Sequence, residues 1–308
     1  MPEFTDVLAA AAATRAHPVG TPCTTCPTGT LADRPDATVV RHGRTVLKAH
    51  APGTDRTRLG PRLTVAARTP GVLLPPLTPT PTDLHGRLVT CWPYGTPVDP
   101  GDPDAAPWEA AGTLLAALHR SHPVPGLPAM RGPAKAARAV ARLTGRPGLG
   151  EAVREAWAAL PAWARAEAPV PGPRAVCHGD FHLGQLVRHP GPNGPWRLID
   201  VDDLGLGAPA WDLARPAAWF ACGLLPPDEW SRFLAAYRRS GGPAVPPDGD
   251  PWPALDVPAR ALTVQSAAQS LLRADREGRA PDEVELALVD ACSRMVSVPA
   301  PRPPASAS

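Results

Sequence analysis

Carboxylate and amide side chains recur at suggestive intervals in one stretch of the chain, Ala175 to Asp203. His178-Gly179-Asp180 follows a short apolar run, and Gln185 comes five residues after Asp180. Two short apolar runs follow, separated by a turn rich in proline and glycine, and this pattern is typical of a β-hairpin. The second run ends at Asp200, and Asp202 and Asp203 come directly after it.

This arrangement favours phosphoryl transfer. That reaction needs a carboxylate that orients and deprotonates an acceptor hydroxyl, and oxygen ligands for Mg²⁺ on the phosphates. Asp180 is our candidate for the catalytic base. The candidate metal ligands are Gln185, Asp200 and Asp202.

Together with Trp211-Asp212-Leu213-Ala214, these motifs resemble the aminoglycoside phosphotransferase and choline kinase family. The resemblance covers about residues 37–240 and is most specific over 175–214. It implies an α+β, bilobal protein-kinase-like fold with a small β-rich N-lobe and a mostly helical C-lobe, and it implies ATP and Mg²⁺ as cofactors. The family usually has Asn at the position of Gln185. The variant loop His182-Leu183-Gly184-Gln185 is similar to that of maltokinase and glucosamine kinase relatives.

Lys48 is a candidate ligand of the nucleotide phosphates. The chain has only two lysines, and Lys48 ends the second strand of a predicted hairpin over 39–50 that turns at His42-Gly43. In kinases a lysine at such a place contacts the α- and β-phosphates. The helix expected after Thr54 has no Glu to pair with it, and Asp55 is the only acid there. The segment from Trp92 to Val98 resembles a hinge between lobes, and its residues Trp92 and Tyr94 are candidates for nucleotide binding.

The resemblance and the apolar patterns divide the chain into an N-terminal lobe, 1–93, a C-terminal lobe, 94–298, and a tail, 299–308, that we expect to be disordered. Further strands are expected at 71–77 and 86–92. The expected helices span 5–16, 54–68, 108–119, 134–143, 151–165, 209–222, 228–239, 257–273 and 281–297.

Composition excludes several classes of protein. A chain of 308 residues is long enough for a bilobal enzyme with a sizeable core. A net charge of +2 gives no electrostatic reason to expect nucleic acid or an anionic membrane as a partner. No apolar run reaches the length of about 20 residues that a membrane span needs. No basic region precedes the first alanines, so we expect no secretory signal and a cytoplasmic location.

Two of the six cysteines form a lone C-x-x-C, Cys23 to Cys26. A zinc site needs two more ligands, and none stands at a matching spacing nearby. A redox site needs a helix directly after the motif, but Pro27 and Gly29 follow it. We therefore expect neither a metal nor redox chemistry here.

Several residues also have a purely structural interpretation. His178 is expected to be a buried, hydrogen-bonded histidine, and Asp212 an acceptor that holds the catalytic loop. Two other functions remain open. One is a non-catalytic nucleotide-binding relative, favoured by Gln185 and the missing helix Glu. The other is a metal-dependent hydrolase that uses His178, Asp180, His182 and Asp200.

The expected acceptor is a small molecule with a hydroxyl group, such as an aminoglycoside, an amino sugar or a sugar. A polycationic acceptor needs a strongly acidic cleft. The acids of the late helices alternate with arginines instead, so a neutral acceptor remains open.

Overall fold

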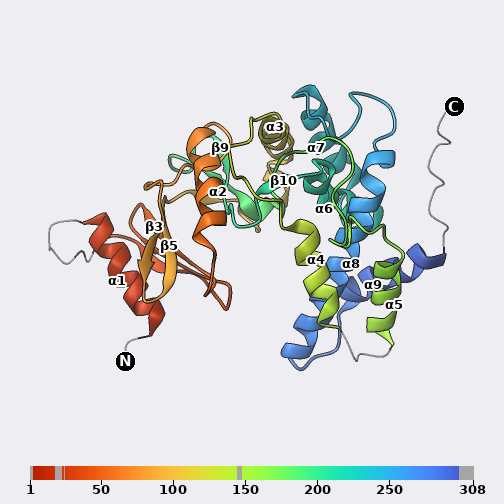
Figure 1. Cartoon of the computed structure of the whole chain (residues 1–308), viewed down its shortest axis with the longest axis horizontal. Coiled ribbons are helices and arrows are strands. Elements are labelled where there is room, and N and C mark those ends of the chain that lie inside the picture. The colour runs from red at the N-terminus through yellow and green to blue at the C-terminus, as the bar shows by residue number, and fades with distance from the viewer. Residues whose placement is uncertain (1–2, 18–22, 24, 144–147, 298–308) are drawn as a thin grey trace.

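A β-sheet region and a helical region follow each other along the chain, as the α+β expectation requires (Figure 1). The computed structural model describes residues 3–17, 23, 25–143 and 148–297. The tail expected at 299–308 lies outside these residues. The division into lobes at residue 93 stays a prediction.

The N-terminal sheet has five antiparallel strands in the order β1-β2-β3-β5-β4. They span β1 Thr28–Arg34, β2 Ala37–His42, β3 Thr45–His50, β4 Thr82–Leu84 and β5 Arg87–Pro93. The hairpin expected around His42-Gly43 is present as β2 and β3. Gly43 has a φ of +58°, which a glycine adopts without strain.

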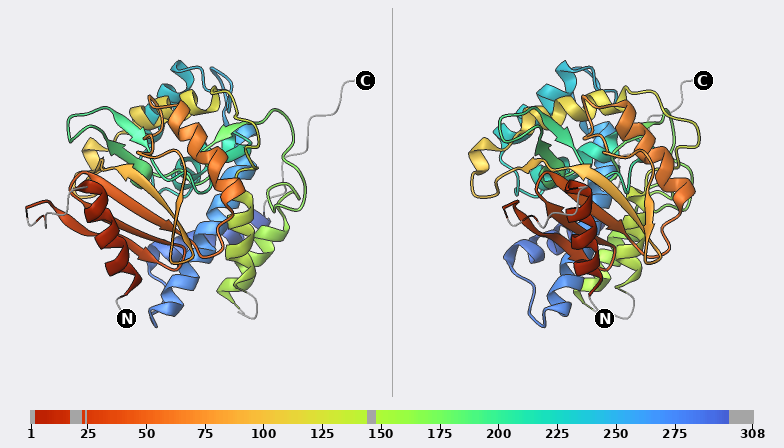
Figure 2. Two further views of the ribbon diagram at one scale, coloured as in Figure 1. Left: turned by 60° about the vertical axis from the view of Figure 1, so that its left-hand side comes forward. Right: turned by 90° about the vertical axis from the view of Figure 1, so that its left-hand side faces the viewer.

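Adjacent residues of a strand point to opposite faces of the sheet, and the two faces of β3 belong to different cores. Helix α1 (Phe4–Ala16) packs on the face that carries Leu47, and α2 (Arg56–Arg68) belongs to the core that contains Val46. Figure 2 shows α1 lying against the strands. Lys48 follows Leu47 in β3 and lies on the same face as Val46.

Two local predictions were wrong. Residues 71–77 do not form a strand; Leu73 makes an isolated bridge to Leu198, and two prolines follow at 75 and 76. A proline has no N–H to donate, so a longer ladder is not available there. The cap of α2 is Asp55, whose side chain accepts a hydrogen bond from the backbone N–H of Thr57, and not Thr54.

Helices dominate the remaining chain, and α3 packs on α7 while α6 packs on α8. They span α3 Trp108–His119, α4 Gly132–Ala141, α5 Leu149–Ala158, α6 Ala210–Ala221, α7 Pro227–Arg239, α8 Trp252–Arg276 and α9 Glu283–Ser297, with 3₁₀ turns η1 Pro103–Ala105 and η2 Leu183–Gln185. None of these helices combines the length and the apolar character that crossing a bilayer requires.

Five short strands position the candidate catalytic loop. They are β6 Thr96–Pro97, β7 Ala175–Cys177, β8 Leu186–Arg188, β9 Trp196–Leu198 and β10 Gly205–Gly207. β7 pairs with β10, and β8 lies between β6 and β9. The loop that carries Asp180 therefore leaves one small sheet and enters the other. Asp200 follows the expected hairpin of β8 and β9, two residues after it ends.

Candidate active site

A cavity of about 380 Å³ lies between the N-terminal sheet and the hairpin of β8 and β9. Its walls include the apolar side chains of Val39, Val46, Leu74, Val187 and Ile199. Lys48, Gln185, Asp200 and Asp202 also line it together with the two predicted hinge residues, so six of the predicted site residues share one cavity. An apolar slot with a charged end can hold a planar base and its phosphates.

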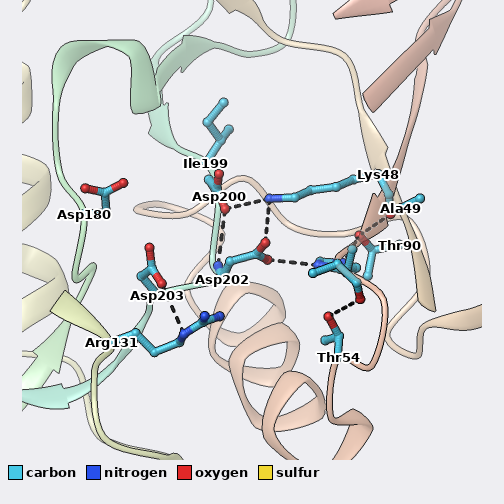
Figure 3. A network of polar contacts seen from close by, with 12 residues as sticks. Lys48, Ala49, Thr54, Thr90, Arg131, Asp180, Ile199, Asp200, Asp202 and Asp203 are labelled. Carbon is cyan, nitrogen blue, oxygen red and sulfur yellow. Dashed lines mark hydrogen bonds and ion pairs between the residues drawn. The ribbon is translucent and has the colours of Figure 1, made fainter. Parts of the chain in front are cut away.

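Lys48 forms ion pairs with two carboxylates (Figure 3). Its Nζ lies 2.7 Å from Oδ1 of Asp200 and 3.0 Å from Oδ2 of Asp202. Burial by itself lowers the pKa of Lys48, but the two negative charges more than offset this and raise it above its ordinary value. Lys48 is therefore a fixed positive charge at this end of the cavity.

Asp202 supplies a carboxylate that pairs with Lys48, a role in which kinases use an acid of the helix after the lysine strand. Its Oδ1 lies 3.0 Å from Nδ1 of His50 while its Oδ2 contacts Lys48. Burial alone raises the pKa of Asp202, but Lys48 and His50 hold it well below its usual range. Asp55, the only acid at the start of α2, caps that helix and takes no part in this network.

The oxygen atoms around Asp200 fit a hard divalent cation. Asp200 has a φ of +65°, uncommon for a residue other than glycine but tolerated by Asp. Its Oδ1 also accepts the backbone N–H of Asp202 at 3.3 Å. Gln185, 9% exposed, also lines the cavity and carries an amide oxygen that could serve as a ligand. Carboxylate and amide oxygens are ligands that Mg²⁺ accepts, so the donor set fits the expected metal.

Asp212 holds the backbone of the catalytic loop, as expected for a structural acceptor. It is 1% exposed and accepts the backbone N–H groups of His178 at 2.6 Å and Gly179 at 2.8 Å. Nε2 of His119 lies 3.0 Å from the same carboxylate. A Cβ on Gly179, whose φ is +85°, would come within 2.3 Å of the carbonyl oxygen of Asp203, so this loop requires a glycine.

Asp180 is held between two cations that the sequence analysis missed. Its Oδ2 lies 2.5 Å from Nζ of Lys135, and its Oδ1 accepts a hydrogen bond of 2.8 Å from Arg215. Burial raises the pKa of this carboxyl, but the two cations outweigh burial and lower it to about 2. Asp180 is therefore an ionised carboxylate at neutral pH, and it does not line the cavity described above.

Lys135 also connects Asp180 to Asp203. Its Nζ lies 3.0 Å from Oδ2 of Asp203, whose Oδ1 is 3.5 Å from Nε of Arg131. Lys135 comes from α4 and Arg215 from α6, far from the loop in sequence. One signal could have found Lys135, because the scarcity of lysine that drew attention to Lys48 applies equally to it. Both lysines of the chain form ion pairs with carboxylates of the candidate site.

The two hinge residues line the cavity, but the backbone of Tyr94 is engaged elsewhere. Its N–H donates to the carbonyl oxygen of Arg44 at 2.7 Å, and its own carbonyl lies 3.1 Å from Nδ1 of His189. The indole of Trp92 donates to Thr90 at 2.8 Å. Any adenine contact through Tyr94 would therefore compete with bonds already made.

The histidines of the loop do not form a metal site with Asp180 and Asp200. His178 is fully buried and its Nε2 donates to the carbonyl oxygen of Ile199 at 2.7 Å, while its Nδ1 has no partner among the described residues. Nδ1 of His182 accepts the N–H of Gly184 at 3.1 Å. Among the described residues no group of potential metal-ligand atoms unites these histidines with Asp180 and Asp200, so the geometry gives the hydrolase alternative no support.

Comparison with known proteins connects this geometry to a family. A model described as "Phosphotransferase enzyme family" matches residues 37–255. A comparison with curated protein sequences found no match. Solved structures similar to this chain share the fold at low sequence identity.

One is a choline/ethanolamine kinase family protein from Mesorhizobium loti, 20% identical with a TM-score of 0.62, covering 95% of this chain and 93% of that one. Another is a macrolide 2'-phosphotransferase from Brachybacterium faecium, 20% identical with a TM-score of 0.54, covering 96% and 100%. A spectinomycin phosphotransferase in complex with ADP and spectinomycin is 15% identical with a TM-score of 0.56, covering 88% and 91%. These likenesses support the protein-kinase-like fold.

Proposed function

This chain belongs to the phosphotransferase enzyme family, and we propose that it transfers the γ-phosphoryl group of ATP to a hydroxyl group of a small, uncharged polar molecule. The observation that carries the proposal is the convergence of Lys48, Asp200 and Asp202 at one end of a single cavity. ATP as the donor is consistent with the expected cytoplasmic location.

The nucleotide end of the proposed site is built around Lys48. Its buried ammonium would bind phosphate oxygens, and its ion pairs with Asp200 and Asp202 fix where it points. Asp200, Asp202 and Gln185 would hold Mg²⁺, which neutralises charge on the phosphates during transfer. The apolar walls of the cavity would contact the base and exclude water from it.

Asp180 is the proposed catalytic base. Its carboxylate would accept the proton of the acceptor hydroxyl as that oxygen forms its bond to the γ-phosphorus and the bond to the leaving ADP breaks. Lys135 and Arg215 each contact one of its oxygens, and each oxygen keeps a lone pair that can accept the acceptor hydroxyl. A positioned carboxylate with a low pKa stays ionised and ready to orient the hydroxyl.

The charges around Asp180 favour an uncharged acceptor over an aminoglycoside. Three cations, Lys135, Arg131 and Arg215, contact the two acids Asp180 and Asp203, which leaves one positive charge in excess. Lys48 with Asp200 and Asp202 brings the site to four cations and four acids, so a polycation entering here would meet no acidic field. We therefore propose a sugar or another neutral polyol as the acceptor.

The proposal is tested by measuring ATP consumption with a panel of sugars, amino sugars, aminoglycosides and choline-like alcohols. We expect Mg²⁺-dependent turnover with at least one neutral sugar or polyol, and loss of that turnover in Asp180→Asn. Asp248→Asn, at an exposed position in the loop after α7, is the matched control and should behave as wild type. Turnover only with aminoglycosides would contradict the acceptor class, and ATP binding without turnover on any acceptor would favour a non-catalytic relative.

A further inference from the structure

Two histidines lie next to the C-x-x-C motif, although neither is close to it in the sequence. His17 and His42 each place a ring nitrogen in one group with the thiols of Cys23 and Cys26, and all four atoms lie within 4.8 Å of one another. The expectation that this motif lacks further ligands was therefore wrong. The search along the sequence missed them because one precedes the motif by six residues and the other follows it by sixteen.

The fold explains how these residues meet. His17 is the C-terminal cap of α1, and its N–H donates to the carbonyl oxygen of Ala13 at 2.9 Å. His42 ends β2 on the face where Val40 packs against α1. Since α1 lies against that face, its last turn brings His17 to the end of the strand, and the two imidazole rings contact edge to face at 5.2 Å.

The C-x-x-C segment is fixed against the same end of the hairpin. The N–H of Gly43 donates to the carbonyl oxygen of Pro27 at 2.8 Å, and a Cβ on Gly43 would lie only 3.2 Å from Sγ of Cys26. Within the motif, the N–H of Cys26 donates to Sγ of Cys23 at 3.3 Å. The turn thus brings both sulfur atoms to one side, a geometry that suits a shared ligand.

The separation of two of the ligand atoms matches that in a tetrahedral zinc centre. Zinc bonds of about 2.0–2.3 Å to nitrogen and sulfur place the ligand atoms about 3.3–3.8 Å apart. Sγ of Cys26 lies 3.3 Å from Nε2 of His17. His42 is 7% exposed, and its buried Nε2 has no hydrogen-bond partner among the described residues. An imidazole nitrogen without a partner at such a position is costly unless something binds it.

We propose that His17, Cys23, Cys26 and His42 bind one structural Zn²⁺ ion. Two thiolates and two neutral imidazoles form a closed tetrahedral set with no position left for a substrate, and soft sulfur ligands favour zinc over magnesium. Binding releases the two thiol protons, and the zinc keeps its oxidation state.

The ion would join the end of α1 to the turn between β2 and β3. That turn contacts the hinge, because Arg44 accepts the N–H of Tyr94 and the guanidinium of Arg41 lies 3.4 Å from the centre of the Tyr94 ring. The zinc would therefore stabilise the part of the sheet that borders the cavity. A redox role is disfavoured, because the strand β1 follows the motif where a helix would be needed to activate a thiol.

The test is metal analysis of the full chain after removal of any affinity tag and dialysis. We expect about one zinc per chain in wild type and below about 0.1 in the double variant Cys23→Ser/Cys26→Ser, because the thiolates are essential ligands. Cys222→Ser, a half-buried cysteine on the C-terminal side of α6, is the matched control and should keep its zinc. Asp200→Asn should also keep it, which separates this site from the proposed magnesium site.

A second measurement stays informative if the double variant fails to fold. Wild type freed of metal by a chelator should melt at a lower temperature, and Zn²⁺ but not Mg²⁺ should restore the melting temperature. Co²⁺ in its place should give the near-ultraviolet absorption of a thiolate–metal bond. Three results would overturn the proposal. The wild-type protein could contain no zinc and give no cobalt–thiolate band, or the double variant could retain its zinc. The third is a Cys23–Cys26 disulfide in protein purified from a reducing cytoplasm.

Discussion

Replacing Asp180 by Asn removes the proposed base while keeping its size and its place between Lys135 and Arg215. A positioned general base contributes about 10²–10⁴-fold to the rate, so we expect kcat to fall by about that factor. The KM for ATP should stay near that of wild type, because Asp180 does not line the nucleotide cavity. Steady-state kinetics with the best acceptor of the panel measures both quantities, and Asp248→Asn is the control.

The same substitution has a predicted cost in stability. The fall of the Asp180 pKa from 3.8 to about 2 corresponds to a stabilisation of the ionised carboxylate by about 2 kcal/mol. A lowered pKa contributes stability above the ordinary value, and this contribution is lost as the pH falls through about 2. The free energies of unfolding of wild type and Asp180→Asn should therefore differ most near neutral pH and converge in acid.

Denaturant titrations at several pH values measure that difference. An unchanged kcat would refute the assignment of Asp180 as base. A collapse of ATP affinity would show instead that this carboxylate holds the metal or the nucleotide. A stability difference that grows as the pH falls from 4 to 2 would contradict the ionised, ion-paired state of Asp180.

Three further substitutions separate the roles of the other residues. Lys48→Ala should raise the KM for ATP and lower kcat, since it removes the buried charge facing the phosphates; wild-type values for both would leave Lys48 without a role in binding. Gln185→Ala should raise the Mg²⁺ concentration needed for half-maximal rate and be partly rescued by more Mg²⁺, whereas an unchanged requirement would make Gln185 a packing residue. Asp212→Ala leaves two buried N–H groups unpaired and should lower the free energy of unfolding by about 2–5 kcal/mol, measured by denaturant titration. A loss of activity without a loss of stability in Asp212→Ala would argue against its structural role.

The sequence predicted best where the periodic pattern was long. The helix at 108–119 has the expected bounds, and the hairpin turns at Gly43 as expected. Short elements were harder, because β4 has only three residues and the apolar run at 71–77 finds its single partner in Leu198, far along the chain. Helix α8 begins at Trp252, five residues before the expected start. Pro253 does not prevent this, since it lies in the first turn, where a missing N–H costs nothing.

Some residues of the candidate site could be predicted from the sequence and others could not. Gln185, Asp200 and Asp202 could be chosen from motif spacing and Lys48 from its rarity and its strand position, and all four line one cavity. Arg215 could not, and Lys135 had only its rarity as a signal, because helices α4 and α6 bring them to Asp180 through tertiary packing that no local pattern encodes. His17 and His42 were missed for the same reason, since a helix end and a strand end meet only in the folded sheet.

Transfer of phosphorus-32 from the γ-position of ATP to an identified acceptor tests the central claim most directly. Wild type should place the label on a hydroxyl of a neutral sugar or polyol in a Mg²⁺-dependent reaction, with ADP formed in equal amount. Asp200→Asn should bind and transfer little at any Mg²⁺ concentration, and Asp180→Asn should bind ATP but transfer at least about 10²-fold more slowly. Label released only as inorganic phosphate by wild type, or transfer at the wild-type rate by both variants, would contradict the account.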